Sequence, residues 1–518
     1  MVLDRGRLSP YILEIARERV TTNRSGELMA LDGGRSTLGG TKRLTLKDAV
    51  AQSVGLMGPV FSIAFLVPLL VGLNASGRGA GNAAALSVVI AAIGVLGLGW
   101  IVAEYTRKIQ AAGSLYDYVT DGLGARVGAA AGWLYYTGLI ALGSAILPMI
   151  GGTIHDTILA EFNVQPFPQL VWDLLLLVLV AVTMFLGVSL STRVQLILAL
   201  ISLTVVGIFS IFVIGKSGGV HHVVAGFSPN SSPTHWSGVL FGVLYGVLLF
   251  TGFETSANLG EETTEPSRDI PRAVLFSVLA IGGFYIIATF SQIAGFHFNL
   301  STLSKNAVTP LFTLAGPSSG GGYGSVVMRR IVELVVIFDM IAVLIGCAVS
   351  ASRGVFAMAR DNRLPRSFAK ISSRGTPAGA SSVVMLVYAV IIILTVTTSI
   401  FAIPNLPHYV AIFSWFSTYG AFAIVIIYLL ISVGALRGLK DRGKPVALCS
   451  ASLVGILVTA GAIFGSIYKV TKPTIEAPYA ALVILVIGIV AAFVMKDTPK
   501  LESDFSGLTP SEQGPLKL

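Results

Sequence analysis

Long apolar runs alternate with short polar segments along most of the chain. A helix needs about 20 mostly apolar residues to cross the hydrocarbon core of a bilayer. Twelve runs have roughly this length: Val50–Gly72, Ala83–Ala103, Gly128–Ile154, Leu174–Leu190, Val194–Gly215, Val239–Gly260, Ala273–Phe296, Ile331–Ala359, Ser382–Ile403, Val410–Leu436, Val446–Tyr468 and Tyr479–Met495. The pattern therefore predicts an all-α integral membrane protein with twelve transmembrane helices.

The composition supports the same class of protein. Of the 518 residues, 54% are hydrophobic and only 12% are charged, whereas charged residues approach about 25% in a water-soluble protein. A soluble enzyme on a single membrane anchor is therefore excluded. Cys347 and Cys449 both fall inside apolar runs, so neither a disulfide framework nor a cysteine-rich metal site is predicted.

The basic residues behind the net charge of +9 lie in short clusters between the apolar runs, so no nucleic-acid partner is predicted. Loops on one side of the predicted membrane carry twenty-one Lys and Arg residues, and loops on the other side carry seven. Because Lys and Arg favour the cytoplasmic side, both termini are predicted to be cytoplasmic. The polar ends, residues 1–44 and 497–518, are predicted to be cytoplasmic tails.

Two of the twelve runs contain residues that interrupt helices. In the first run, Gly55 and Gly58 precede Pro59, which has no N–H to give a helix and whose ring disfavours helical conformation in the preceding residue. In the sixth run, Gly252 stands two residues before Glu254, at a depth where a carboxylate is costly. Both patterns predict broken helices with exposed backbone groups.

The two breaks occupy corresponding places in successive halves of five runs, and such paired interruptions indicate a transporter binding site. The start of a half-helix offers N–H donors to an anion, and the end of one offers carbonyl oxygens to a cation. Together they suit the zwitterion of an amino acid. Two other interpretations stay open, because Gly-Pro pairs often only kink a helix and Glu254 is also suited to a structural hydrogen bond.

Four motifs resemble those of amino acid permeases of the amino acid, polyamine and organocation superfamily, over about Leu46–Met495. They are Gly58–Ser62; Ala112–Tyr118 with Gly124; Phe250–Glu254 followed by Glu261, Glu262, Pro266 and Ile270–Arg272; and Ser350–Arg353 with Ala359–Asp361 and Leu364–Pro365. The resemblance implies the leucine-transporter-like fold. Residues 45–216 and 236–436 would form two inverted five-helix repeats, and residues 445–496 would add two helices.

The resemblance also implies where a substrate binds. Its carboxylate would meet backbone N–H groups in the first span, and its ammonium group would meet carbonyl oxygens in the sixth. The first set lies near Gly55, Gly58, Val60, Phe61 and Ser62, and the second near Phe250, Thr251, Gly252 and Phe253. Glu254 matches a family glutamate that helps to link occupancy to gating.

The coupling ion is left open. Some similar permeases carry a lysine in the fifth span whose ammonium group replaces a sodium ion, but the same register after Arg193 places Ser202 in this chain. A sodium site formed by Ser350 or Ser352 with first-span carbonyls, proton coupling and plain exchange are the alternatives. No cofactor and no other metal site are predicted.

One further acid lies within a predicted span, and an intramembrane acid is a functional candidate. Asp339 stands nine residues beyond Arg330. It is suited to attracting a cationic amine, to accepting a proton, or to pairing with Arg329 or Arg330 near Glu333.

A cluster of acidic residues follows the sixth span. Glu261, Glu262, Glu265 and Asp269 are expected to oppose the basic loop 353–374. Their pairing would latch the cytoplasmic gate.

These patterns predict a secondary transporter of the cell membrane that moves a small amino acid by alternating access. A polyamine or other organic-amine permease or exchanger of the same fold is the first alternative, and a non-transporting receptor is the second. An enzyme is not predicted, because no nucleophile–base pair or metal spacing emerges. The predicted partners are a small-molecule substrate and the lipid bilayer, and no oligomeric state is predicted.

Overall fold

The computed structural model describes residues 43–494, apart from 73–78, 187, 306–309, 403–406, 469–471 and 473–474. The chain separates into residues 1–38 and 39–518, and every described residue belongs to the second unit. The two predicted tails lie outside the described residues, except for Arg43 and Leu44 at the end of the first.

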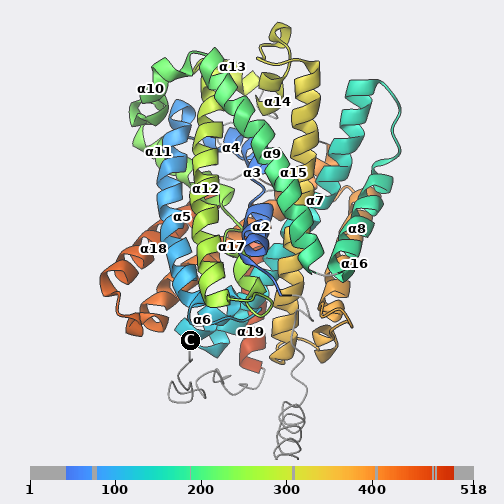
Figure 1. Cartoon of the computed structure of the whole chain (residues 1–518), viewed down its shortest axis with the longest axis vertical. Helices are drawn as coiled ribbons and strands as arrows, with labels where there is room; N and C mark the ends of the chain where they lie inside the picture. Colours follow the sequence, from blue (N-terminus) through green and yellow to red (C-terminus); the bar gives the residue numbers. More distant parts are fainter. Residues whose placement is uncertain are drawn as a thin grey trace, which may run out of the picture. The chain divides into compact units, whose positions relative to one another are not determined.

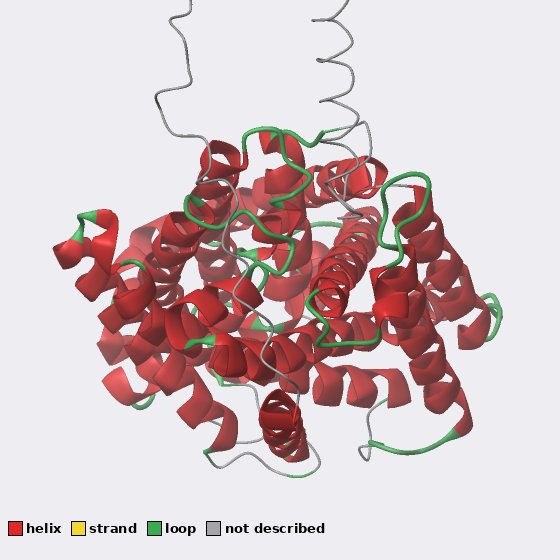
Figure 2. Cartoon of the chain, turned by 90° about the horizontal axis from the view of Figure 1, so that it is seen from below, coloured by secondary structure: helices red, strands yellow, loops and turns green. Residues whose placement is uncertain are grey.

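The prediction of an all-helical protein is confirmed for the described part of the chain, in which Figure 2 shows only helices and loops. Within the described residues, eleven segments are long and apolar enough to cross a membrane. The first consists of α2 (Leu46–Met57) and α3 (Pro59–Phe65). The others are α5 (Ala84–Thr106), α7 (Ala125–Phe162), α8 (Gln169–Leu186), α9 (Val188–Lys216), α12 (Pro266–Gly295), α15 (Val326–Arg360), α16 (Ala378–Thr397), α17 (His408–Gly438), α18 (Pro445–Ile467) and α19 (Glu476–Val494).

The sixth predicted span is not one helix. Its apolar part forms α11 (Trp236–Leu249), and a turn then leads to the 3-10 helix η4 (Thr255–Leu259). The remaining elements are short: α4 (Val67–Val71), α6 (Leu115–Leu123), α10 (Val223–Phe227), α13 (Leu300–Lys305), α14 (Pro310–Ala315), η1 (Gly81–Ala83), η2 (Gly219–His222), η3 (Pro229–Ser231), η5 (Ser318–Gly320), η6 (Arg366–Ala369) and η7 (Lys440–Arg442).

Several helices extend beyond the apolar runs that predicted them. α12 begins at Pro266 rather than near Ala273, because proline suits the first turn of a helix and Asp269 there favours the positive end of the helix dipole. α7 continues past Ile154 and ends where Asn163 adopts the left-handed conformation. Hydrophobicity marks the part of a helix within lipid, whereas capping residues mark its ends.

The broken first span lies inside the bundle. α2 and α3 both pack against α9, α12 and α15, which pass beside them in Figure 1. The helices α8, α18 and α19 are more peripheral, with roughly a quarter of their apolar stretches buried. Their exposed aliphatic side chains suit contact with lipid, so the enclosed first span is the better place for polar chemistry.

Candidate functional site

The first span is two helices joined at a single glycine. α2 ends at Met57, Gly58 adopts the left-handed conformation with φ 53° and ψ 64°, and α3 begins at Pro59. Pro59 suits this place because the first N–H of a helix has no partner within the helix. A Cβ on Gly58 would lie 2.2 Å from Val343 Cγ2. Both the backbone and its surroundings therefore require glycine at the break.

The second break follows α11. The helix ends at Leu249, and Gly252 has a φ of 111°, a value that residues with a side chain rarely adopt. A Cβ on Gly252 would lie 2.2 Å from Leu56 Cδ2 and 3.1 Å from the Leu56 carbonyl carbon. The turn at Gly252 therefore rests directly on the last residues of α2.

The structure brings the two breaks together. Ser53 Oγ of α2 donates a hydrogen bond of 2.7 Å to the Phe253 carbonyl oxygen. Thr255 Oγ1 of η4 lies 3.4 Å from the Gln52 carbonyl oxygen. Segments about 200 residues apart in the chain thus form one polar region in the interior.

A tyrosine of α12 connects the carbonyl ends of both broken helices. The Tyr285 hydroxyl lies 2.6 Å from the Leu249 carbonyl oxygen at the end of α11 and 3.4 Å from the Met57 carbonyl oxygen at the end of α2. Ser62 Oγ also donates to the Met57 oxygen, at 2.9 Å. Because buried carbonyl oxygens are costly when unpaired, these hydroxyls stabilise the breaks.

The predicted N–H donors of the first break divide into two kinds. Gly58 and Ser62 donate to backbone carbonyls one turn earlier. Val60 and Phe61 instead donate to Asp339 Oδ2 of α15, at 2.9 and 2.8 Å. Two N–H groups are therefore available for an anion at this break, and a carboxylate of the protein accepts from both.

Asp339 does not pair with the nearby arginines, so that alternative is wrong. Arg329 and Arg330 both bind the Glu161 carboxylate, and Arg329 also lies 3.6 Å from Glu333 Oε1. Asp339 is fully buried, and its Oδ1 has no hydrogen-bond partner among the described residues. Half of this carboxylate is thus unsatisfied inside the bundle.

Glu254 forms a compact hydrogen-bonded group beside the second break. Its Oε2 accepts from the Tyr428 hydroxyl at 2.6 Å and from the Gly252 N–H at 3.1 Å, and its Oε1 accepts from the Tyr135 hydroxyl at 3.1 Å. The carboxylate is fully buried and ties the break to α7 and α17. It therefore forms the structural hydrogen bonds that the sequence left open, and these bonds join the break to two further helices.

Two other predicted residues lie away from the breaks. Gly55 is inside regular helix α2, where a Cβ would lie 2.5 Å from Gln195 Oε1, so it allows close approach of α9. Ser202 Oγ of α9 lies 2.7 Å from the Val335 carbonyl oxygen and 2.9 Å from the Leu198 carbonyl oxygen. Ser202 therefore joins α9 to α15 at Val335, which lies one helical turn before Asp339.

The serines predicted for a sodium site bond to different groups. Gln52 Nε2 donates to Ser350 Oγ at 2.9 Å and to the Gly346 carbonyl oxygen at 3.1 Å. Ser352 Oγ donates to the Val349 carbonyl oxygen at 2.9 Å. An amide group of the first span thus occupies the side of Ser350 that faces α2.

Several polar side chains of this region were not predicted from the sequence. They are Gln52, Tyr135, Tyr285, Gln292 and Tyr428, all inside predicted spans, and Gln292 Nε2 donates to the Ile63 carbonyl oxygen of α3 at 3.0 Å. The available signal was an amide or phenol within an apolar run, since such groups need a partner in lipid. Their partners are too distant in sequence for that signal to identify.

Two ion pairs join the loop after η4 to the end of α15. Arg353 Nε lies 2.6 Å from Glu262 Oε1, and both side chains are 2% exposed. Arg360 Nη2 lies 2.7 Å from Glu261 Oε1. We call these two pairs the loop latch.

The start of the described chain reinforces the loop latch. Leu44 bridges to Thr263, and Arg43 Nη1 donates to the Glu261 carbonyl oxygen at 2.8 Å. Glu265, which was expected to oppose the basic loop, pairs instead with Arg268 of its own helix. The loop latch therefore contains two of the four acidic residues predicted to oppose the basic loop, Glu261 and Glu262.

A carboxyl near the loop latch titrates in the neutral range. Burial raises the pKa of Asp117 in α6 to about 8, and the charge of Asp361 adds to the rise. A raised pKa favours the protonated carboxyl in the folded chain. Its contribution to stability is complete below the ordinary pKa and is lost as the pH rises through about 8.

Removing the cation of the buried pair should open the loop latch. In Arg353→Ala, the Glu262 carboxylate stays buried without its partner, and breaking such a pair costs about 3–5 kcal/mol. We expect maleimide to label Ser256→Cys at least about tenfold faster, in a background where Cys347 and Cys449 are serine.

The matched control is Arg268→Ala, because the pair of Arg268 with Glu265 is more than half exposed and contributes little. Its labelling rate should equal that of the parent. Equal labelling rates in Arg353→Ala and the parent would show that the loop latch does not restrict access to residue 256.

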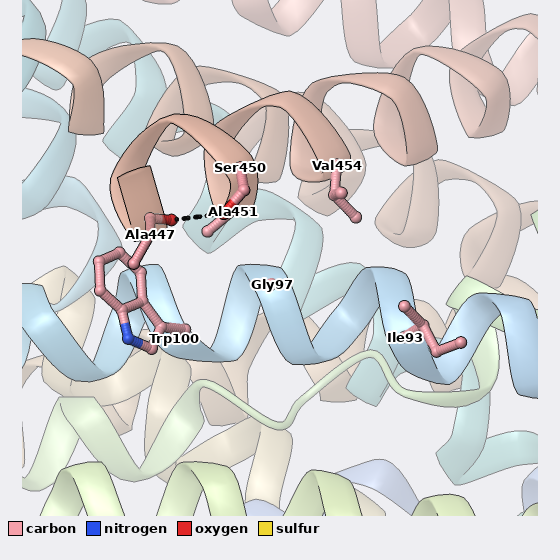
Figure 3. A pocket seen from close by; sticks show the side chains of 7 residues that line it. All are labelled: Ile93, Gly97, Trp100, Ala447, Ser450, Ala451 and Val454. Carbon is pink, nitrogen blue, oxygen red and sulfur yellow. Dashed lines mark hydrogen bonds between the residues drawn. The ribbon is translucent and has the colours of Figure 1, made fainter. Parts of the chain in front are cut away.

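A separate cavity of about 270 Å³ lies between α5 and α18. Figure 3 shows its lining by apolar side chains of both helices, among them Ile93, Trp100 and Val454. The one hydrogen bond drawn there joins Ser450 to the Ala447 carbonyl oxygen within α18. None of its seven lining residues is charged or belongs to either break.

The apolar helices and the paired broken spans define the class of the protein, a multi-pass membrane transporter rather than an enzyme. Within that class, residues 53–503 match the amino acid permease family, and the chain belongs to this family.

Several curated relatives are amino acid transporters. A branched-chain amino acid permease of Lactococcus lactis is 23% identical over 470 residues, which cover 87% of this chain and 93% of that protein. A vacuolar cationic amino acid transporter of Arabidopsis thaliana is 28% identical over 64% of this chain and 55% of its own length. A D-serine/D-alanine/glycine transporter of Escherichia coli is 25% identical over 51% of this chain and 55% of its own length.

Solved structures share the fold. A mutant manganese transporter of Eremococcus coleocola aligns over 89% of this chain and 98% of its own, with a TM-score of 0.53 and 13% sequence identity. At that identity the likeness concerns the fold alone.

Proposed function

We propose that the protein is a secondary transporter that moves an amino acid across the cell membrane by alternating access. The observation that carries this proposal is at the first break, where Val60 and Phe61 direct N–H groups at a carboxylate. The second break contacts the first through the Ser53 hydroxyl and the Phe253 carbonyl oxygen. The relatives named as amino acid transporters support the substrate class. Twelve spans, with the broken segment from α11 to η4 as the sixth and with two inverted five-helix repeats, complete the proposed architecture.

The zwitterion would lie between the breaks. Its carboxylate would accept hydrogen bonds from Val60 and Phe61, where Asp339 accepts them now. Its ammonium group would meet the turn 250–253, where Thr251 Oγ1 is buried without a hydrogen-bond partner among the described residues. Glu254 would transmit occupancy of the turn to α7 and α17 through its two tyrosines.

Because Lys and Arg favour the cytoplasmic side, both termini and the loop latch would lie on that side. With the loop latch formed, the cytoplasmic path to the breaks would be closed. Opening of the loop latch and closure of the opposite side would then expose the same site to the cell interior.

Exchange in proteoliposomes tests the proposal. Purified protein should accumulate radiolabelled amino acid against an unlabelled pool of the same compound, and protein-free vesicles should not. Absence of exchange for all twenty amino acids would contradict amino acid transport.

An organic amine is a second candidate substrate, because the carboxylates of Asp339 and Glu254 are both buried at the breaks and bond to no basic side chain among the described residues. Exchange of polyamines without exchange of amino acids would favour this candidate.

Uptake should not require sodium. The Gln52 amide already donates to Ser350 Oγ, and Ser352 Oγ donates to the Val349 carbonyl oxygen within α15, so both serines of the sodium site considered from the sequence have other partners. We expect equal initial rates when N-methylglucamine replaces sodium. A fall of more than about tenfold would show that a cation displaces the Gln52 amide.

A further inference from the structure

We propose that Asp339 is a resident competitor for the carboxylate position of the substrate, and that it takes up a proton when an amino acid displaces it. The proposal rests on the proposed function. It makes Asp339 the residue that couples amino acid entry to proton entry.

The competition follows from the hydrogen bonds at the first break. Asp339 Oδ2 accepts from both Val60 and Phe61, the two N–H groups of the break that are not used within the helix. A second carboxylate cannot accept from the same two donors while the first remains, because like charges at this distance repel strongly. A bound amino acid and the present position of Asp339 therefore exclude one another.

Among the described residues, no basic side chain bonds to Asp339. Tyr285 of α12 is the titratable side chain that faces Asp339 from another element, and its hydroxyl is directed to the Leu249 carbonyl oxygen. On α15 itself, Arg329 and Arg330 are bound to Glu161.

Three titratable groups on other helices packed against α15 have partners elsewhere, and a fourth, Tyr388 of α16, is a phenol that carries no positive charge. Tyr135 of α7 bonds to Glu254, Tyr136 of α7 bonds to the Gly113 carbonyl oxygen, and Asp173 of α8 accepts from Gln169. Among the described residues, none of these groups offers a positive charge to Asp339.

A buried carboxylate without a cation or donors is costly in the membrane, and binding a proton removes the charge. The proton would come from the outer water as the amino acid enters. It would leave to the cytoplasm when the amino acid departs and Asp339 again accepts from Val60 and Phe61. One zwitterion and one proton would cross together, so each cycle would move one positive charge.

Binding measured against pH tests the proposal in the whole protein, with the amino acid that is exchanged best as probe. At low pH the displaced Asp339 of the wild type binds a proton, and Kd should be constant there. Above that pH range, Kd should rise about tenfold for each unit of pH. In Asp339→Asn, Kd should be independent of pH and lower than that of the wild type at high pH, because no charge competes. Proton influx, read with a pH-sensitive dye, should no longer accompany uptake.

The control is Asp173→Asn, which removes another fully buried acid far from the breaks in sequence. This variant should keep the wild-type slope of Kd with pH. An Asp339→Asn protein that binds more weakly at every pH, with the slope unchanged, would show that Asp339 only positions α3.

Two other outcomes would overturn the proposal. Loss of binding in Asp339→Asn for an amine that has no carboxylate would make Asp339 a cation site. Amino acid exchange that carries no protons in the wild type would leave the proposed function standing and remove the coupling. Failure of the wild type to bind any amino acid would instead contradict the proposed function itself.

Discussion

Gly252→Ala should lose most transport. The φ of 111° at this position is strained for any residue with a side chain, at a cost of about 1–3 kcal/mol. The new Cβ would also lie 2.2 Å from Leu56 Cδ2, so Leu56 must move at the end of α2. Since both effects act where the two breaks touch, we expect initial uptake to fall at least about tenfold at equal protein content in the vesicles.

Gly283→Ala is the matched control. Gly283 lies on α12 without a positive φ, and no heavy atom is within 4 Å of its added Cβ. Alanine also favours a helix over glycine by about 1 kcal/mol. This variant should transport like the wild type, and wild-type uptake by Gly252→Ala would show that the turn does not need its present backbone.

Glu254→Gln should cause the second large loss. The carboxylate accepts three hydrogen bonds, from Tyr428, Tyr135 and the Gly252 N–H. A glutamine has one acceptor oxygen and must direct an N–H₂ group toward donors on its other side. Hydrogen bonds to a charged group are worth about 1.5–3 kcal/mol each, so we expect at least about a tenfold fall in uptake.

Single hydroxyl deletions refine this test. Tyr428→Phe removes one hydrogen bond to Glu254 and should give a smaller loss of uptake. Because the two side chains interact, the loss in the double variant should be smaller than the sum of the two single losses. Tyr388→Phe is the control, since the buried Tyr388 hydroxyl has no partner among the described residues. Full uptake by Glu254→Gln would show that the hydrogen bonds of Glu254 to Tyr135 and Tyr428 are not needed for gating.

Features that depend on residues close together in the chain, such as helix interruptions and membrane-length apolar segments, could be predicted from the sequence. Pro59 and the glycines beside it act on their own backbone, so their residue types alone locate an interruption. Apolar runs located the eleven membrane-length segments of the described chain, because the thickness of the bilayer sets the length of such a run. In the sixth run the break was likewise predicted from Gly252 beside Glu254, although the apolar pattern alone continues past the end of α11.

The sequence could not predict contacts that join distant helices. Asp339 meets Val60 and Phe61 across about 280 residues, whereas its own neighbourhood in the chain offered only the arginines as partners. The partner of an intramembrane acid depends on which helix faces are packed together. Apolar periodicity does not record that choice when helices are apolar on nearly all sides.

A structure of the protein with a transported amino acid bound tests the central claim most directly. We expect the ligand carboxylate within about 3.2 Å of the Val60 and Phe61 nitrogens, with Asp339 no longer bonded to either and with the ammonium group against the turn 250–253. A ligand bound elsewhere, such as the cavity between α5 and α18, with Asp339 still accepting from Val60 and Phe61, would contradict the claim.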